Sequence, residues 1–383
     1  MSDLLRKVRE AAKNCGCGHH HDISIELIDT EPGALGRAAT YSKSKKWQTV
    51  GIVSDEVIYN LFGERLRKKL HEAGIQTELC KVRSDEQGDV VADEQAIVQV
   101  MVDIPITVDA YVVLGSGTLH DIVRFVSSRV GKPFVSVPTA PSVDGFTSAG
   151  APIILRGFKQ TIYTGAPVAL FADPDIYGKA PQTMVAAGFG DMIGKHTSLF
   201  DWKFSHAVGG EAYCPATAAL TRETLQWCED AQESISAGSE EGVKRLMEAL
   251  LLSGLAMLLF GASHPASGAE HHLSHDWEME LLRRKSKQLL HGAKVGVACA
   301  IIAEKYSEWR PDVELTGVPG LVEALDALPS SDSLRARLRD VGGPTTAAEL
   351  GIEKELVKAS LLRAHTHRVG RNTLLKRHNE GHS

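Results

Sequence analysis

Four histidines lie close together in one stretch of the second half of the chain. The stretch "EHHLSHDWEMELLRRKSKQLLHG", residues 270–292, contains His271, His272, His275 and His291. His271 and His275 are four residues apart, so they share one face if the first part of this stretch is helical. His291 follows at the start of another helical pattern. Imidazole groups gathered in this way predict a divalent metal site.

A carboxylate that could complete the site occurs in "GFGDMIGKHTS", residues 188–198. There Asp191 lies between small residues that permit close helix packing. Two imidazoles and one carboxylate leave coordination positions open, which is typical of a catalytic metal site. His272 would point elsewhere on a helix and is expected to be a surface or packing residue. The spacing alone does not decide which of the other three histidines bind.

A rival cluster lies near the N-terminus. The segment "CGCGHHHD", residues 15–22, contains Cys15, Cys17, His19, His20 and His21. Structural zinc sites usually need two well-spaced ligand pairs, and this Gly-rich segment offers one compact group. We therefore expect metal scavenging here rather than a native site. A non-catalytic metal-binding protein built on this segment would leave the later histidines without a role.

The elements that must position these residues differ between the two halves of the chain. Apolar runs over 49–55, 76–82, 109–117, 134–140 and 166–173 predict buried strands. Helical patterns over 56–74 and 119–131 lie between them. This alternation predicts a parallel sheet covered on both faces.

After residue 181 the strand signals end and helical spacing continues. We expect an α/β dinucleotide-binding domain over 1–178 and an all-helical metal- and substrate-binding domain over 179–383. The turn residues of "DPDIYGKAPQ" place the boundary near 175–182. Ligands of open parallel sheets bind beyond the carboxyl ends of the strands, often in the cleft to the next domain.

A glycine-rich turn follows one of these strands. In "VVLGSGTLHD", Gly115 and Gly117 allow a tight turn before a helix expected to begin near Leu119. Its N-terminal N–H groups would suit a cofactor pyrophosphate. The usual third glycine is missing, because His120 takes its place. An ordinary glycine-rich turn is the alternative.

Two further polar sites end predicted strands. The loop "SVPTAPSVDGFTS", residues 136–148, is too polar for a core and predicts a surface that lines a ligand, with a solvated turn capped by Asp144 as the alternative. Asp55 ends the first strand. Its carboxylate could accept the ribose hydroxyls of NAD or cap the following helix, and both interpretations stay open.

Composition excludes several classes of function. The formal charge of −6 on 383 residues gives no electrostatic case for nucleic acid or an anionic membrane. Six cysteines are too few for a disulfide scaffold, and reduced thiols in the cytoplasm are the simplest expectation. The N-terminus does not resemble a signal peptide. The apolar stretch 247–263 contains Glu248 and is too short to span a bilayer.

Five motifs together resemble one enzyme family. "GSGTLHD", "PTAPSVDGFTS", "GFGDMIGKHTS", "SHPASGAEHHLSH" and "LLHGAKVGVA" are similar to those of the bacterial sn-glycerol-1-phosphate dehydrogenases. That family is related to glycerol dehydrogenase, dehydroquinate synthase and the iron-type alcohol dehydrogenases. The resemblance extends over about residues 20–310 and implies a dehydroquinate synthase-like fold.

The resemblance also implies roles for individual residues. Asp191, His271 and His291 would be the metal ligands, and the metal would be zinc, nickel or iron. Asp144, Asp191 and His275 would contact the substrate as catalytic residues. Lys159 corresponds to a lysine near the cofactor or substrate phosphate. The NAD shell would be Asp55, Gly115, Ser116, Gly117, Thr118, Leu119, Thr139, Ala140, Pro141, Ser142 and Ser148.

The implied reaction is the reversible, metal-dependent reduction of dihydroxyacetone phosphate to sn-glycerol 1-phosphate. NADH is the expected reductant and NADPH is possible. The family resemblance implies a cytoplasmic homodimer that supplies glycerol-1-phosphate-based phospholipid synthesis. The alternatives are a glycerol dehydrogenase acting on unphosphorylated polyols and a dehydroquinate synthase-like sugar-phosphate cyclase. The cyclases normally place a Glu where Asp191 stands, which favours the dehydrogenase.

Overall fold

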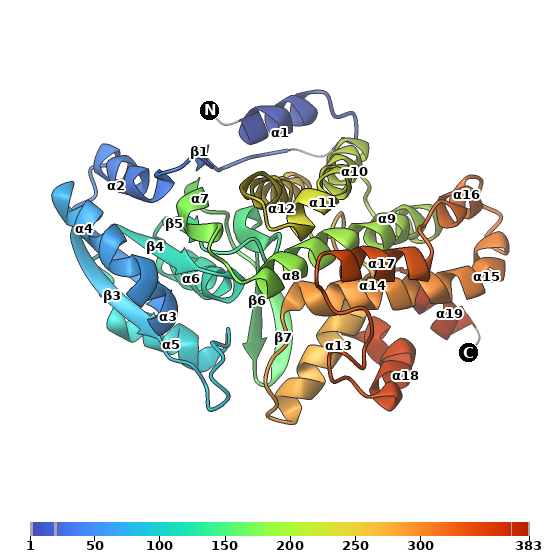
Figure 1. Ribbon diagram of the computed structural model, residues 1–383. Helices are drawn as coiled ribbons and strands as arrows, with labels where there is room; N and C mark the ends of the chain where they lie inside the picture. The colour runs from blue at the N-terminus through green and yellow to red at the C-terminus, as the bar shows by residue number, and fades with distance from the viewer. Residues whose placement is uncertain (1–2, 19–20, 369, 382–383) are drawn as a thin grey trace.

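A parallel sheet forms the core of the N-terminal half, as expected, but it has six strands, and the sequence did not predict the first of them (Figure 1). The computed structural model describes residues 3–18, 21–368 and 370–381. The strand order is β1-β8-β5-β4-β2-β3. The inner strands are continuously apolar because helices cover both faces of the sheet. The strands are β1 (Leu27–Asp29), β2 (Thr49–Asp55), β3 (Gln76–Val82), β4 (Ala110–Gly115), β5 (Phe134–Pro138) and β8 (Ala169–Phe171).

Two groups of helices cover this sheet. On one face α2 (Ala34–Ser44) and α4 (Glu64–Glu72) pack on the strands. On the other face α5 (Glu94–Asp103) and α6 (Gly117–Val130) do so. The single helix predicted over 56–74 is interrupted: α3 (Glu56–Ile58) leads into the π-helical turn η1 (Tyr59–Gly63) before α4 begins.

Two expected element ends need correction. The strand predicted over 109–117 ends at Gly115, and α6 already begins at Gly117 rather than near Leu119. The glycine turn is therefore tighter than predicted. The strand predicted over 166–173 is reduced to β8, because Asp173 instead caps the short helix α7 (Pro174–Tyr177).

An antiparallel hairpin, which the sequence did not predict, leaves the sheet of the first half. Its strands are β6 (Gly150–Leu155) and β7 (Phe158–Tyr163), and β7 reaches the helix that carries His271 (Figure 1). Arg156 and Gly157 form the two-residue turn, both with positive φ, as the favoured hairpin turns require. The hairpin brings Lys159 to the boundary between the two halves.

The second half is helical, as predicted (Figure 1). The apolar stretch around Glu248 lies in α12, which is the buried centre of the largest core cluster. No helix among the described residues is long and apolar enough to cross a membrane. The helices are α8 (Gln182–Ile193), α9 (Lys195–Gly209), α10 (Pro215–Asp230), α11 (Gln232–Ser236), α12 (Glu240–Phe260), α13 (Ala269–Arg283), α14 (His291–Glu308), α15 (Arg310–Glu314), α16 (Leu321–Asp326), α17 (Ser331–Asp340), α18 (Lys354–Arg363) and α19 (Leu374–Gly381), with 3-10 turns η2 (Gly145–Thr147) and η3 (Ala364–Arg368).

The N-terminal helix α1 (Asp3–Lys13) packs against α10 and α12 of the helical half (Figure 1). Its apolar face contributes Leu4, Leu5 and Val8 to the core cluster around α12. The chain then crosses to the sheet, where β1 pairs with β8. A domain division at 178/179 remains a proposal.

Candidate active site

Asp191, His271 and His291 come together at one point in the helical half. Each offers one oxygen or nitrogen atom, and these three atoms lie within 4.8 Å of one another. His271 Nε2 is 3.7 Å from Asp191 Oδ1. The side chains come from three helices: Asp191 from α8, His271 from α13, and His291 from the first turn of α14.

Small residues allow α8 and α14 to approach closely enough for this meeting. A Cβ on Gly190 would lie 2.5 Å from the carbonyl oxygen of Gly292, and one on Gly292 would collide with the carbonyl of Ala187. Neither backbone group can rotate away as a side chain could. Gly190, which precedes Asp191, and Gly292, which follows His291, therefore set the separation of the two donors.

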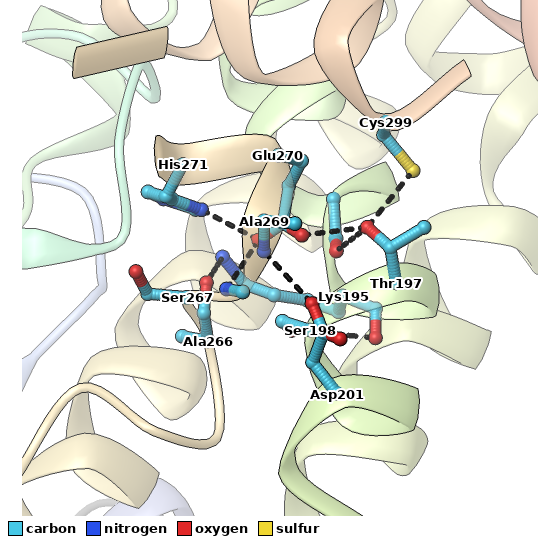
Figure 2. A network of polar contacts seen from close by, with 12 residues as sticks. Lys195, Thr197, Ser198, Asp201, Ala266, Ser267, Ala269, Glu270, His271 and Cys299 are labelled. Carbon is cyan, nitrogen blue, oxygen red and sulfur yellow. Dashed lines mark hydrogen bonds and ion pairs between the residues drawn. The ribbon is translucent and has the colours of Figure 1, made fainter. Parts of the chain in front are cut away.

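The buried carboxylate of Glu270 binds the ring nitrogen of His271 that faces away from Asp191 (Figure 2). Glu270 accepts a hydrogen bond from His271 Nδ1 at 2.8 Å and from Thr197 Oγ1 at 2.7 Å. Burial raises the pKa of Glu270, but the hydrogen bond and charge of His271, together with the hydrogen bonds from Gly268 N–H and Thr197, lower it overall, so the carboxylate stays ionised. With the proton on Nδ1, the Nε2 lone pair of His271 faces Asp191. Carboxylate–histidine pairs of this type orient histidines that bind metals.

Lys195 is a buried cation that the sequence reading overlooked. Its Nζ lies 2.8 Å from Asp144 Oδ2 and 3.1 Å from Asp191 Oδ1. Burial alone would lower the pKa of Lys195, but these two carboxylates raise it overall. Its place four residues after Asp191, on the same face of consecutive helices, was the only available signal.

The donor set fits a divalent cation. Asp144, Asp191 and Glu270 are buried carboxylates, and among the described residues Lys195 is the only lysine or arginine that contacts them. Burial, and after it the neighbouring His271, hold the pKa of His291 well below its usual range. The imidazole is therefore neutral, as a ligand must be, and the surplus negative charge would be balanced by a metal.

The other two histidines of the motif are placed differently. His275 lines the same cavity, but its ring centroid is 6.2 Å from that of His271 and 6.1 Å from that of His291. Burial keeps His275 neutral by lowering its pKa well below the usual range. His272 is buried away from the donors, in agreement with a packing role.

A cavity of about 330 Å³ joins this cluster to the sheet. The histidines His271, His275 and His291 line one part of it. Another part of the lining contains predicted cofactor and substrate residues, namely Ser116, Gly117, Thr118, Ser142, Asp144 and Ser148. The N-terminus of α6 has no side-chain cap, so its N–H groups remain available to an anion.

Several predicted cofactor residues lie behind this lining. A Cβ on Gly115 would collide with Leu119, and Thr139 donates its N–H to the Gly115 carbonyl at 3.1 Å. Asp55 accepts from the N–H of Ile58 at 2.8 Å and caps α3, as its alternative interpretation predicted. The predicted ligand Asp191 does not line the cavity either. The predicted cofactor residues that do not line it are Asp55, Gly115, Leu119, Thr139, Ala140 and Pro141.

His120, at the position of the missing glycine, anchors the turn. Its Nδ1 donates to the carbonyl of Ser116 at 2.8 Å, and its Nε2 lies 2.8 Å from Ser136 Oγ. Complete burial lowers the pKa of His120 to about 3, so the ring is neutral and can accept the hydroxyl proton. This side chain therefore ties the glycine turn to β5.

Three cations border the cavity. Lys159 and Lys294 both pair with Glu278, at 2.7 Å and 2.8 Å. Arg368 makes no ion pair with any described residue and instead donates to Ser263 Oγ at 2.9 Å. Only Lys159 was predicted. Arg368 lies beyond the stretch in which the sequence carried recognisable motifs.

Comparison with known proteins agrees with this architecture. The family described as "Iron-containing alcohol dehydrogenase" matches residues 29–181. The fold resembles that of glycerol dehydrogenase from Schizosaccharomyces pombe, with a TM-score of 0.69 at 19% identity over 90% of this chain and 82% of that one. At this identity the likeness concerns the fold alone.

Full-length relatives are much more similar in sequence. Glycerol-1-phosphate dehydrogenase (NAD(P)+) of Geobacillus thermodenitrificans is 47% identical, covering 98% of this chain and 97% of the relative. The protein of the same name from Bacillus subtilis is 44% identical, covering 96% and 94%. By this similarity along almost its whole length, the chain belongs to the glycerol-1-phosphate dehydrogenase (NAD(P)+) family.

Proposed function

We propose that this protein reduces dihydroxyacetone phosphate reversibly to sn-glycerol 1-phosphate with NADH or NADPH and one divalent metal ion. The observation that carries the proposal is a single cavity lined both by the glycine turn at the N-terminus of α6 and by the three histidines of α13 and α14. The name shared by the similar full-length relatives supplies the substrate.

Asp191, His271 and His291 would hold the metal, which would supply Lewis-acid stabilisation of the negative charge developing on the C2 oxygen, worth several kcal/mol. The glycine turn would bind the cofactor pyrophosphate and thereby orient the nicotinamide toward C2. Zinc, nickel and iron all suit this donor set. Side chains that line the cavity would bind the hydroxyl and phosphate groups of the substrate.

His275 and Asp144 are the residues we propose to contact the substrate. His275 is neutral and buried, so it can hold a substrate hydroxyl or pass a proton toward solvent. Asp144 Oδ2 is fixed by Lys195 and by Ser253, at 2.8 Å each, which leaves Oδ1 for a substrate hydroxyl. Lys195 keeps Asp144 and Asp191 oriented and does not itself line the cavity.

Arg368 is the side chain we propose for the phosphate. The positive charges of Lys159 and Lys294 are partly neutralised by Glu278, whereas Arg368 has no carboxylate partner among the described residues. A guanidinium group matches the geometry of phosphate oxygens. A half-buried cation without a carboxylate partner is costly, and a phosphate dianion in the cavity would balance it.

The two alternatives are not favoured. The relatives of 42–47% identity carry one name, that of the glycerol-1-phosphate enzyme. The likeness to a glycerol dehydrogenase rests on fold at 19% identity. A cytoplasmic location, a homodimeric state and a role in glycerol-1-phosphate-based phospholipid synthesis belong to the same proposal.

The decisive assay follows NADH consumption with dihydroxyacetone phosphate on metal-stripped protein reloaded in turn with zinc, nickel or iron. Free dihydroxyacetone is the parallel substrate. We expect oxidation that needs both metal and phosphate. In Arg368→Gln the KM for the phosphorylated substrate should rise about 10- to 100-fold, whereas the exposed Arg129→Gln should change nothing. Turnover of the free substrate alone would refute the proposal.

A further inference from the structure

We propose that Cys15, Cys17, His21 and Cys214 form a second metal site, a structural zinc site that fastens the N-terminal segment to the helical half. The site is separate from Asp191, His271 and His291, which share no residue with it. It is also independent of the proposed reaction. The sequence led us to expect no native site in "CGCGHHHD", because the segment carries one compact ligand group. That expectation did not consider Cys214, which lies far away in the chain.

The four ligand atoms lie close enough together for one ion to reach all of them. All lie within 4.8 Å of one another. Cys15 Sγ is 3.3 Å from Cys214 Sγ, and Cys17 Sγ is 3.2 Å from His21 Nε2. Cys214 Sγ is 3.7 Å from the same nitrogen. Zinc bonds of about 2.3 Å to sulfur and about 2.0 Å to nitrogen separate tetrahedral ligands by about 3.5 to 3.8 Å.

The surroundings of two ligands are those of a metal site. His21 Nδ1 donates to the carbonyl oxygen of Leu259 at 2.8 Å. A carbonyl can only accept, so the proton must be on Nδ1 and the Nε2 lone pair faces the sulfurs. Cys214 Sγ accepts from Thr217 N–H at 3.4 Å and from Thr217 Oγ1 at 3.1 Å. Both donors favour the thiolate, which is the form that binds metal.

The ligand set selects zinc in a structural role. Three sulfurs and one imidazole close the tetrahedron and leave no position for a substrate. Cys214 is buried, whereas Cys15, Cys17 and His21 are half-buried, which gives an ion a path into the site. The thiols pack beside the buried Trp202 and the partly buried Tyr213, so a bound ion would lie against an apolar wall.

The position of the site explains what a zinc ion would stabilise. Cys15 and Cys17 follow α1, whose apolar face is buried in the helical core. Cys214 caps α10, and the carbonyl that orients His21 belongs to the last turn of α12. The ion would therefore join the ends of three helices. The loop after α12 continues into Ser263, which holds Arg368 at the edge of the cavity.

Cobalt substitution tests the site with a signal that the other metal site cannot give. Thiolate ligands to Co²⁺ produce intense charge-transfer bands, whereas Asp191, His271 and His291 offer no sulfur. We expect these bands in the wild type and in His291→Ala, and a marked fall in their intensity in Cys214→Ser, which removes one of the three thiolates. Cys80→Ser, which changes another buried thiol on β3, should retain them.

Metal analysis gives the independent count. Protein purified under reducing, zinc-replete conditions should contain two ions per chain, falling to one in Cys15→Ser/Cys17→Ser and to one in His291→Ala. The midpoint of thermal unfolding should fall in the cysteine variant, while its remaining ion still supports turnover. The wild-type cobalt spectrum needs no variant, so it decides even if Cys214→Ser fails to fold.

Two results would overturn the proposal. The first is stoichiometrically bound cobalt in the wild type without thiolate bands. The second is a Cys15–Cys214 disulfide in protein isolated without oxidant and mapped by mass spectrometry, because that bond would consume two of the four ligands. Failure of the reaction assay with an intact cobalt signal would count against the proposed function and leave the zinc site standing.

Discussion

Contacts with neighbouring residues fix the orientation of each side chain in the candidate active site. The Asp191 carboxylate accepts hydrogen bonds from Lys195 Nζ at 3.1 Å and from the backbone N–H of Asp144 at 3.0 Å. His271 is fixed by Glu270. His291 begins a helix and lies against His271, with ring centroids 5.1 Å apart. Each donor can therefore be removed or disoriented separately.

Replacing His291 by Ala should remove the metal from this site together with activity. One of three donors is lost, and the Lewis-acid contribution of several kcal/mol goes with it. We expect kcat to fall about 1000-fold or more, which corresponds to about 4 kcal/mol. Metal content and steady-state kinetics are measured on the same preparation, with the exposed His71→Ala as control. Full activity with retained metal would show that His291 is not a ligand.

Glu270→Gln should weaken metal binding without abolishing catalysis. The amide keeps the shape of the side chain but loses the charge that orients and polarises His271. Metal affinity should fall about 10- to 100-fold, and saturating metal should restore most of kcat. Glu280→Gln, in the last turns of the same helix and paired with Arg283 instead of a histidine, is the matched control. An unchanged metal titration curve would assign Glu270 a purely structural role.

At the scale of elements, the contact between α8 and α14 decides whether the donors meet. Gly190→Ala would place a methyl group against the carbonyl of Gly292, which has no room to move. We expect a loss of about 1–3 kcal/mol in the free energy of unfolding and weaker metal binding. Urea unfolding and metal titration measure the two effects.

A second helical glycine provides the control for this substitution. A Cβ on Gly36 in α2 would meet only the flexible Lys69 side chain at 3.9 Å. Gly36→Ala should therefore be neutral or slightly stabilising, because alanine favours the helix. Equal behaviour of the two variants would mean that α8 and α14 can separate without cost, and that the small residues are not what positions Asp191.

The elements also show why some features were predictable and others were not. Continuous apolar runs located β2, β4 and β5, since a strand buried on both faces has few alternatives. The edge strand β3 is only partly buried and was also located. The hairpin of β6 and β7 was missed because it is short and half-exposed, so its alternation carries little signal.

Site residues whose partners are distant in the chain were also hard to predict from the sequence. The donors Asp191, His271 and His291 were found because the motifs around them are dense. Arg368 and Cys214 were not, because their roles depend on partners brought close only by the fold. Lys195 was overlooked as well: Asp191 lies four residues before it, but its second partner Asp144 is distant in the chain. A buried lysine, an arginine without a carboxylate partner and a cysteine at a helix cap have no distinctive sequence pattern.

At the scale of the molecule, the candidate site divides its tasks between the two halves. All three metal donors lie on helices of the second half, while the glycine turn belongs to the sheet of the first. The hairpin and η3 bring Lys159 and Arg368 to the shared cavity. Metal and cofactor should therefore bind to separate parts of the fold and meet only through the substrate.

This division predicts that NADH binds without the metal. In His291→Ala the glycine turn and its anchor His120 should be unchanged, since His120 bonds to Ser116 and Ser136 and, within the described part of the chain, not to the donor cluster. We expect a Kd for NADH within about threefold of the wild type, or less than about 0.7 kcal/mol, by fluorescence titration. Saturating NADH should raise the unfolding midpoint of both proteins by a similar amount.

Gly117→Val should have the opposite effect on the two ligands. A Cβ at this position would lie 2.8 Å from the Val143 side chain, so the affinity for NADH should fall while the metal content stays unchanged. If NADH binding instead disappears with the metal, the two halves must be coupled through the donor cluster, and the turn alone does not hold the cofactor.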